Sequence, residues 1–236
     1  MNPLTGVLSE AWDLYKKHAA HFLVISFVIY LVVAAITALL SWGLGRFGGF
    51  LGGVVGLFGM FLLQAALVTA VQDVRDGRVD LDVRETVSAA MPKLLPVTGA
   101  GILASIAIGI GFALIIVPGL ILVTFLSLIV PFIVIGRTEA MSSFGRSWRT
   151  VRGNGWHVFG TYVVVFLLLI VANIVIGAVL SFLPATAGNF IAEVVSGTLI
   201  APFIAIVVTL VYYRLTAAHG ETAEPGPAPG SPWDQV

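Results

Sequence analysis

The run Phe22–Leu44, FLVISFVIYLVVAAITALLSWGL, is 23 residues long and contains no charged side chain. About 20 apolar residues are enough for a helix to cross the hydrocarbon core of a bilayer. Charged residues bound the run, with Lys16 and Lys17 before it and Arg46 directly after it. This stretch therefore predicts a transmembrane helix that ends at Arg46.

The composition of the whole chain agrees with this interpretation. Of 236 residues, 58% are hydrophobic and 10% are charged, and the mean hydropathy is +1.05. Soluble domains have about 25% charged residues, and disordered chains have low hydrophobicity, so both classes are excluded. Because the net charge is zero and cysteine is absent, we expect no nucleic-acid partner, no disulfide and no thiol chemistry.

The fold class that follows is an all-α, polytopic transmembrane helical bundle with six spans. The uncharged tract 94–136 is too long for one crossing, and Pro118-Gly119 inside it predicts a turn. Pro131 leaves open whether 97–135 is a full hairpin or partly re-entrant. Residues 1–218 are the predicted membrane domain, and residues 219–236 are a predicted disordered tail. The predicted spans are 22–44, 47–71, 97–117, 120–135, 157–183 and 191–213.

The distribution of cations predicts the orientation of these spans. An even number of spans places both termini on one side of the membrane. Eleven of the twelve Lys and Arg residues then lie on that side, and only Arg46 lies on the other. Since Lys and Arg accumulate in cytoplasmic loops, both termini are predicted to be cytoplasmic.

Each segment that precedes an outward-going span has apolar residues at helical spacing, which predicts interfacial amphipathic helices over 4–18, 82–94 and 138–152. In the third segment, the predicted apolar face consists of Met141, Phe144, Trp148 and Val151. The first and third segments match in register, because Trp12, Lys16 and His21 have the spacing of Trp148, Arg152 and His157. We therefore expect three parallel repeats, each an interfacial helix and a two-span hairpin. The alternative is that these are ordinary amphipathic connectors.

The segments 114–121, 131–134, 143–153 and 156–160 (LIIVPGLI, PFIV, SFGRSWRTVRG and WHVFG) resemble the membrane domain associated with glycerophosphoryl diester phosphodiesterases and its stand-alone bacterial and archaeal relatives. The resemblance extends to about Arg214. It implies a membrane fold in a prokaryotic plasma membrane. It does not imply hydrolysis, because the phosphodiesterase catalytic domain has no counterpart in this chain and the acid often found after the second proline segment is displaced to Glu139.

Small residues indicate where helices pack closely. Gly48, Gly52 and Gly56 form a repeated G-x-x-x-G pattern, which allows close backbone approach in lipid. We expect packing within the chain, with a homo-oligomer contact as the alternative. Pro118 and Gly119 are assigned to the same helix-packing class.

Two amide residues and one acidic residue lie within the predicted spans. Gln64 and Asn173 are either interhelical hydrogen-bonding residues or elements of a transport path. Glu193 lies near the outer boundary, where a hydrated interface is favoured over a buried proton or ion site. The pair His18 and His21 lacks the further ligands that a metal site needs.

A second group lies at the cytoplasmic boundary, where basic and aromatic residues cluster. Such clusters attract anionic lipid headgroups, although the arginines could instead only set the topology. The lipid-headgroup candidates are Arg146, Trp148, Arg149, Arg152 and Trp156.

No catalytic motif accompanies these residues, so we expect no enzymatic activity, no cofactor and no metal. The function expected from the sequence is an integral membrane protein that binds or organises lipid, or that is the membrane partner of another protein. The alternative is a small transporter or channel with a polar path between the helices. An intramembrane enzyme is the third class, and it would require a pocket in which His or Glu meets other polar groups.

Overall fold

The computed structural model describes residues 3–75, 79–182 and 185–220. Every regular element in these ranges is helical, and five helices are long and apolar enough to cross a membrane. The elements are α1 (Val7–Lys17), α2 (Ala19–Val74), α3 (Val83–Ala90), the short 3-10 helix η1 (Met91–Lys93), α4 (Leu94–Leu114), α5 (Ile116–Leu126), α6 (Ile129–Val134), α7 (Ala140–Val151), α8 (Gly155–Leu180) and α9 (Ala185–Ala218).

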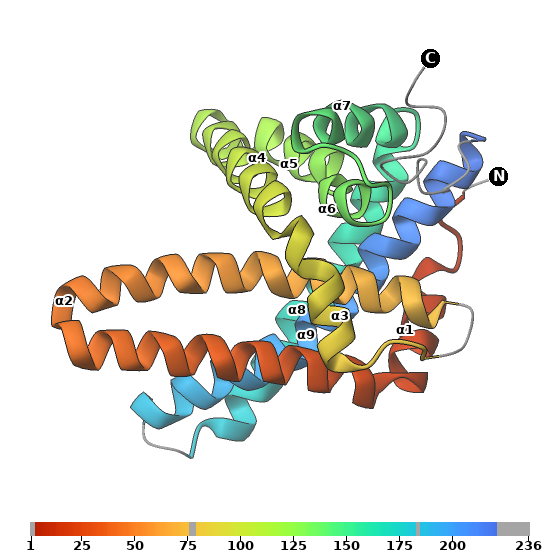
Figure 1. Cartoon of the computed structure of the whole chain (residues 1–236). Helices are drawn as coiled ribbons and strands as arrows, with labels where there is room; N and C mark the ends of the chain where they lie inside the picture. The colour runs from red at the N-terminus through yellow and green to blue at the C-terminus, as the bar shows by residue number, and fades with distance from the viewer. Residues whose placement is uncertain (1–2, 76–78, 183–184, 221–236) are drawn as a thin grey trace.

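The helix α2 is a hairpin of two antiparallel arms (Figure 1). Its backbone leaves helical geometry only at Gly45, with φ 56° and ψ −130°. That conformation is open to glycine, which lacks a Cβ, so the turn forms one residue before Arg46. The expected spans 22–44 and 47–71 fall within the two arms.

Small residues of the second arm of α2 let it pack closely on the first. A Cβ at Gly48 would overlap the Leu40 carbonyl, and a Cβ at Gly52 would lie 2.7 Å from Thr37 Cγ2. A Cβ at Gly56 would meet open space, whereas one at Gly59 would overlap Val33. The close contact within the chain therefore runs through Gly48, Gly52 and Gly59, and Gly56 lies off this line because the helix turns it outward.

The turn expected at Pro118-Gly119 lies three residues earlier in the structure. Ile115 is extended, with φ −158° and ψ 150°, and it separates α4 from α5. Pro118 is then the third residue of α5, in the first helical turn, where an amide hydrogen would have no helical partner in any case. Gly119 is buried, and a Cβ there would lie 2.5 Å from Phe112 of α4. The proline and glycine therefore begin a helix and let it pack closely.

The stretch expected as one span, 120–135, is interrupted between α5 and α6 at Ser127 and Leu128. The hydroxyl of Ser147, from α7, satisfies backbone groups on both sides of this break. It donates to the Phe125 carbonyl at 2.6 Å and accepts from the Leu128 amide at 3.2 Å. The break is therefore held by a side chain from another helix rather than by the local chain.

The other end of α6 is held in the same way. Lys93 Nζ donates to the Val134 carbonyl at 2.6 Å, from the end of η1. The chain turns back after α6. The Gly136 amide donates to the Pro131 carbonyl at 3.2 Å, and Arg137 lies in the left-handed region of backbone conformation, at φ 46°. All residues of α6 except Val130 are buried, so α6 is a short central helix that is fixed at both ends.

The buried face of α7 differs from the expected one. Met141 and Trp148, expected on the apolar inner face, are exposed, whereas Phe144 is partly buried and Val151 is buried. The face turned inward consists instead of three small hydroxyl residues, Ser143, Ser147 and Thr150, together with Val151. The physical reason is the break described above, because a serine that bonds backbone groups must face them. Met141 and Trp148 then share the outer face with the arginines.

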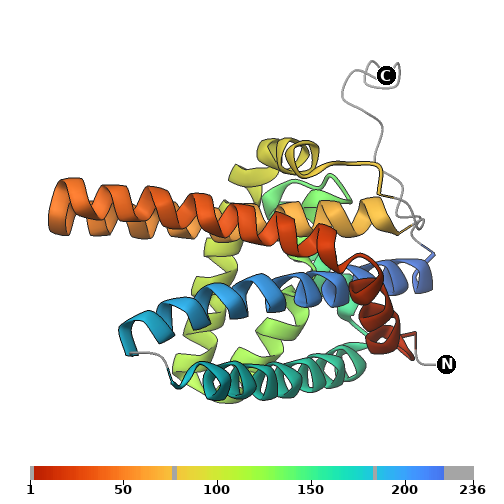
Figure 2. The same ribbon diagram turned by 90° about the horizontal axis from the view of Figure 1, so that it is seen from below.

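The remaining long helices, α8 and α9, form a second pair beside the α2 hairpin (Figure 2). The end of α8 and the start of α9 lie at the same end of the molecule as the Gly45 turn, and α1 lies at the other end. The core is built mainly from the second arm of α2, α6 and the C-terminal half of α9. By contrast α8 is buried only at Val158 and Val165, so most of it faces outward.

We predict that Ser147→Ala lowers the free energy of unfolding by about 1–3 kcal/mol, because it leaves two backbone groups without a partner. Ser142→Ala is the matched control, since Ser142 is an exposed serine of the same helix, and it is expected to change stability by less than about 0.5 kcal/mol. Denaturant unfolding of the detergent-solubilised protein measures both. Equal effects of the two substitutions would contradict the role assigned to Ser147.

Candidate functional site

Of the five residues of the predicted headgroup cluster, three belong to α7, Arg152 is the residue directly after α7, and Trp156 is the second residue of α8. All five are exposed, and Trp156 is 84% exposed. Helix α7 packs against α4, α5 and α6 through its other face, and Figure 1 shows it lying along the bundle near α5 and α6. The tertiary structure therefore leaves all five arginine and tryptophan side chains of this segment exposed.

Two contacts hold this surface in place. The ring of Trp148 lies 4.4 Å from that of Phe125, centroid to centroid. Arg146 donates to Thr138 Oγ1 at 3.0 Å. The first contact reaches back to α5, beside the break that Ser147 closes, and the second reaches the segment between α6 and α7.

The cations of α7 lack acidic partners. Among the side chains that the structure describes, the only ion pairs join Lys16 to Asp13 and Arg214 to Glu10. The side chains of Arg149 and Arg152 make neither a hydrogen bond nor an ion pair within the described part of the chain. Their charges are thus available to an anion outside the protein.

Gln64 and Asn173, the two intramembrane polar candidates whose side chains the structure describes, lie in different surroundings. Gln64 lines a cavity of about 210 Å³ between the second arm of α2, α6 and α9. Asn173 is exposed on α8, where its Nδ2 donates to the Leu169 carbonyl at 2.9 Å. Asn173 is therefore satisfied by its own helix and does not reach the cavity. The side chain of Glu193 lies outside the described part of the structure.

His18 and His21 lie at the start of α2. Their Nε2 atoms are buried and have no hydrogen-bond partner among the described residues. Burial lowers the pKa of His18, and the nearby charges of Lys17 and His21 lower it further, so His18 is neutral at neutral pH. No group of three or more His, Asp or Glu side chains in the described ranges could hold a metal ion.

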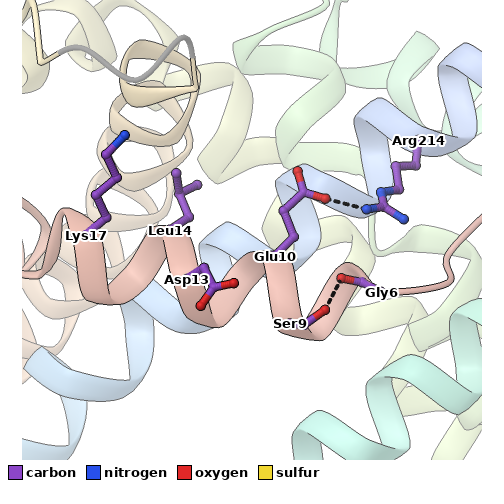
Figure 3. Close-up of a pocket in the computed structure, with 7 residues that line it drawn as sticks. All are labelled: Gly6, Ser9, Glu10, Asp13, Leu14, Lys17 and Arg214. Atoms are coloured by element: carbon purple, nitrogen blue, oxygen red, sulfur yellow. Dashed lines mark hydrogen bonds and ion pairs between the residues drawn. The ribbon is translucent and has the colours of Figure 1, made fainter.

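An open groove of about 560 Å³ lies where α1 meets the C-terminal end of α9 (Figure 3). Glu10 of α1 and Arg214 of α9 point toward one another across it and form an ion pair. Arg214 also donates to the carbonyls of Pro3 and Thr5. The groove is lined by Gly6, Ser9, Glu10, Asp13, Leu14, Lys17 and Arg214. Through this ion pair and these two hydrogen bonds, Arg214 joins the last helix to the first helix and to the residues before it.

Three residues that anchor segments distant in the chain were not singled out from the sequence. Ser147, Lys93 and Arg214 each bond to backbone carbonyls far along the chain. The one available signal is the i, i+4 spacing of Ser143 and Ser147 after a proline-containing span, because small hydroxyl residues in membrane helices commonly bond to neighbouring helices. Lys93 and Arg214 carry no comparable signal.

We predict that Arg214→Met lowers the free energy of unfolding by about 1–3 kcal/mol, because two carbonyl bonds are lost together with the ion pair. Glu10→Gln is expected to cost less than about 1 kcal/mol, since the pair is partly exposed to solvent. The control is Lys16→Met, which breaks a more exposed pair at 3.1 Å and should have almost no effect. Thermal unfolding in detergent tests this order, and a loss for Arg214→Met no larger than for Lys16→Met would contradict it.

Comparison with known proteins adds a family but no activity. A family model described as a domain of unknown function (DUF7847) matches residues 9–219. No curated protein and no solved structure matches the chain significantly. Nothing in these findings links the chain to the membrane domains of glycerophosphoryl diester phosphodiesterases.

Proposed function

This chain belongs to the DUF7847 family, which is described as a domain of unknown function, and we propose that it is a non-enzymatic membrane module that binds anionic lipid headgroups. Its role is inferred from its own residues, because the family description gives none. The binding surface is the outer face of α7 and the start of α8. Arg146, Arg149 and Arg152 attract the headgroup phosphates. Trp148 and Trp156 sit at the boundary between hydrocarbon and headgroups, where indole rings are favoured.

One observation carries this proposal: the exposed arginines of α7 have no carboxylate partner among the described side chains. A basic residue that only marks topology can lie anywhere on the cytoplasmic side. Here three arginines and two tryptophans are all exposed within the segment 146–156, and each cation near an anionic membrane surface contributes about 1 kcal/mol. The arrangement therefore suits headgroup binding better than topology alone requires.

The proposal places six spans in the membrane with both termini in the cytoplasm. The two arms of α2 supply two spans, α4 and the α5–α6 segment two more, and α8 and α9 the last two. A 21-residue helix such as α4 is about 31 Å long, which matches the hydrocarbon core. Each pair follows an amphipathic helix, α1, α3 or α7, as expected for three parallel repeats.

Cysteine accessibility tests this topology cleanly, because the chain contains no cysteine. We predict that Arg46→Cys, beside the Gly45 turn, reacts with a membrane-impermeant maleimide added to intact cells. Arg84→Cys, on α3, should react only after the cells are made permeable. The two variants are matched, since both replace an exposed arginine. Labelling of Arg84→Cys in intact cells would refute the proposed orientation.

Lipid binding is tested by removing the three charges together. For Arg146→Gln/Arg149→Gln/Arg152→Gln we predict a Kd for phosphatidylglycerol at least about tenfold higher than that of the unmodified protein, at low salt. Native mass spectrometry of the protein in neutral detergent, titrated with phosphatidylglycerol or phosphatidylcholine, gives the affinities. High salt should reduce the difference by screening.

The matched control removes three cations from the other amphipathic helices, in the variant Lys16→Gln/Lys17→Gln/Arg84→Gln. An unchanged affinity in the α7 variant would refute the proposal. An equal loss in both variants would also refute it, because the effect would then come from overall charge rather than from the α7 surface.

The rival function, a small transporter or channel, would require a polar path between the helices. The cavity beside Gln64 is lined mostly by apolar side chains such as Leu63, Leu67 and Val208. Asn173 is not part of it. These observations favour the lipid-binding module over the transporter.

A further inference from the structure

The cavity beside Gln64 lies within the membrane-spanning part of the molecule, away from the α7 surface. Its volume is about 210 Å³, and its wall combines residues of α2, α6 and α9. At a rise of about 1.5 Å per residue, Gln64 is about 10 Å from the end of the expected span 47–71. That distance is about a third of the hydrocarbon thickness, so the cavity lies within the hydrocarbon core.

Gln64 is an unsatisfied amide at this depth. Its side-chain amide makes no hydrogen bond with any residue that the structure describes. An amide without a partner in an apolar medium costs several kcal/mol. Such a group in the wall of a cavity indicates that an occupant of the cavity supplies the partner.

The second polar group in the same wall is the carbonyl of Ser127, at the break between α5 and α6. Ser127 and Pro131 both line the cavity. Proline has no amide hydrogen, so Pro131 cannot donate to the Ser127 carbonyl four residues earlier. The Ser127 hydroxyl is engaged with the Thr124 carbonyl at 2.8 Å.

The wall of the cavity reaches the outer surface of the bundle, which faces lipid in the proposed topology. Two residues of its wall are exposed on the outer surface of the bundle, Met60 at 48% and Ile204 at 37%. The inner wall is closed by buried side chains, among them Leu67 and Ala205. A molecule entering by this route comes from the acyl-chain region of the membrane.

We propose that this cavity binds a neutral, single-chain amphiphile from the bilayer, with its hydroxyl group hydrogen-bonded to the Gln64 amide. Gln offers both a donor and an acceptor, which a hydroxyl group satisfies. No cation among the described residues lines the cavity, so a carboxylate or phosphate would be buried without a partner charge. An apolar cavity of about 150 Å³ holds benzene, and by that measure this one holds a chain of about eight carbon atoms.

The probe for this site is 3-azioctanol, an eight-carbon alcohol that forms covalent bonds on illumination. The full-length protein in nanodiscs is labelled with it, with and without excess octanol, and the labelled positions are mapped by peptide mass spectrometry. We expect labels on the α2 and α9 walls of the cavity, around Leu63, Leu67 and Val208, which octanol removes. Labels confined to outward-facing residues such as those of α8, unaffected by octanol, would overturn the proposal.

Two variants test the role of the amide. Gln64→Leu is expected to reduce labelling of the cavity about fivefold, the loss expected from one hydrogen bond. Asn173→Leu is the matched control, because it removes an intramembrane amide that does not reach the cavity, and it should leave labelling unchanged. Equal labelling in Gln64→Leu and the unmodified protein would show that only an apolar chain, or water alone, occupies the cavity.

A variant that fills the cavity separates binding from folding. Ala205→Phe places a ring in the inner wall and should abolish competed labelling. The lipid affinity of the α7 surface should remain, since Ala205 and α7 are on different elements. Persistent competed labelling in Ala205→Phe would overturn the assignment of the site to this cavity.

Discussion

In hydrocarbon, backbone N–H and C=O groups must find partners within the protein, and the break between α5 and α6 exposes both kinds of group. Ser147 meets this constraint with a single hydroxyl that bonds Phe125 on one side and Leu128 on the other. Lys93 does the same at the far end of α6. A buried helix of six residues can persist at the centre of the bundle because two other elements complete its hydrogen bonds.

This constraint determines how α7 is turned. With Ser143, Ser147 and Thr150 facing inward, the larger residues Met141 and Trp148 face outward beside the arginines. A helix whose outer surface combines tryptophan and arginine is suited to the membrane interface. The proposed headgroup surface is thus a consequence of the hydrogen bonds that close the break.

The same break shapes the cavity beside Gln64. Pro131 and Ser127 belong to its wall, so the break forms part of the boundary of the cavity. At the other end of the bundle, Arg214 ties α9 to the residues before α1, so the first and last helices are held together. The two proposed sites lie on different elements but depend on one interrupted helix.

Much of the architecture follows from the order of residues alone. Long uncharged runs predict helices in a membrane, because charge is costly there, and amphipathic spacing predicts α1, α3 and α7. The Gly48 and Gly52 spacing predicts close packing, and the charged connectors limit where helices begin and end. These inferences hold because they depend on neighbouring residues, whose spacing the chain itself specifies.

Only the tertiary structure decided which face of each helix turns inward and where the interruptions lie. It moved the turn from Pro118 to Ile115, turned Trp148 outward, and placed Gln64 but not Asn173 at a cavity. Each of these depends on contacts between residues far apart in the chain, such as Ser147 with Phe125 or Lys93 with Val134. Periodicity along one helix cannot reveal a partner on another, so the sequence determined the membrane class and the candidate residues, whereas the packing determined which of them meet.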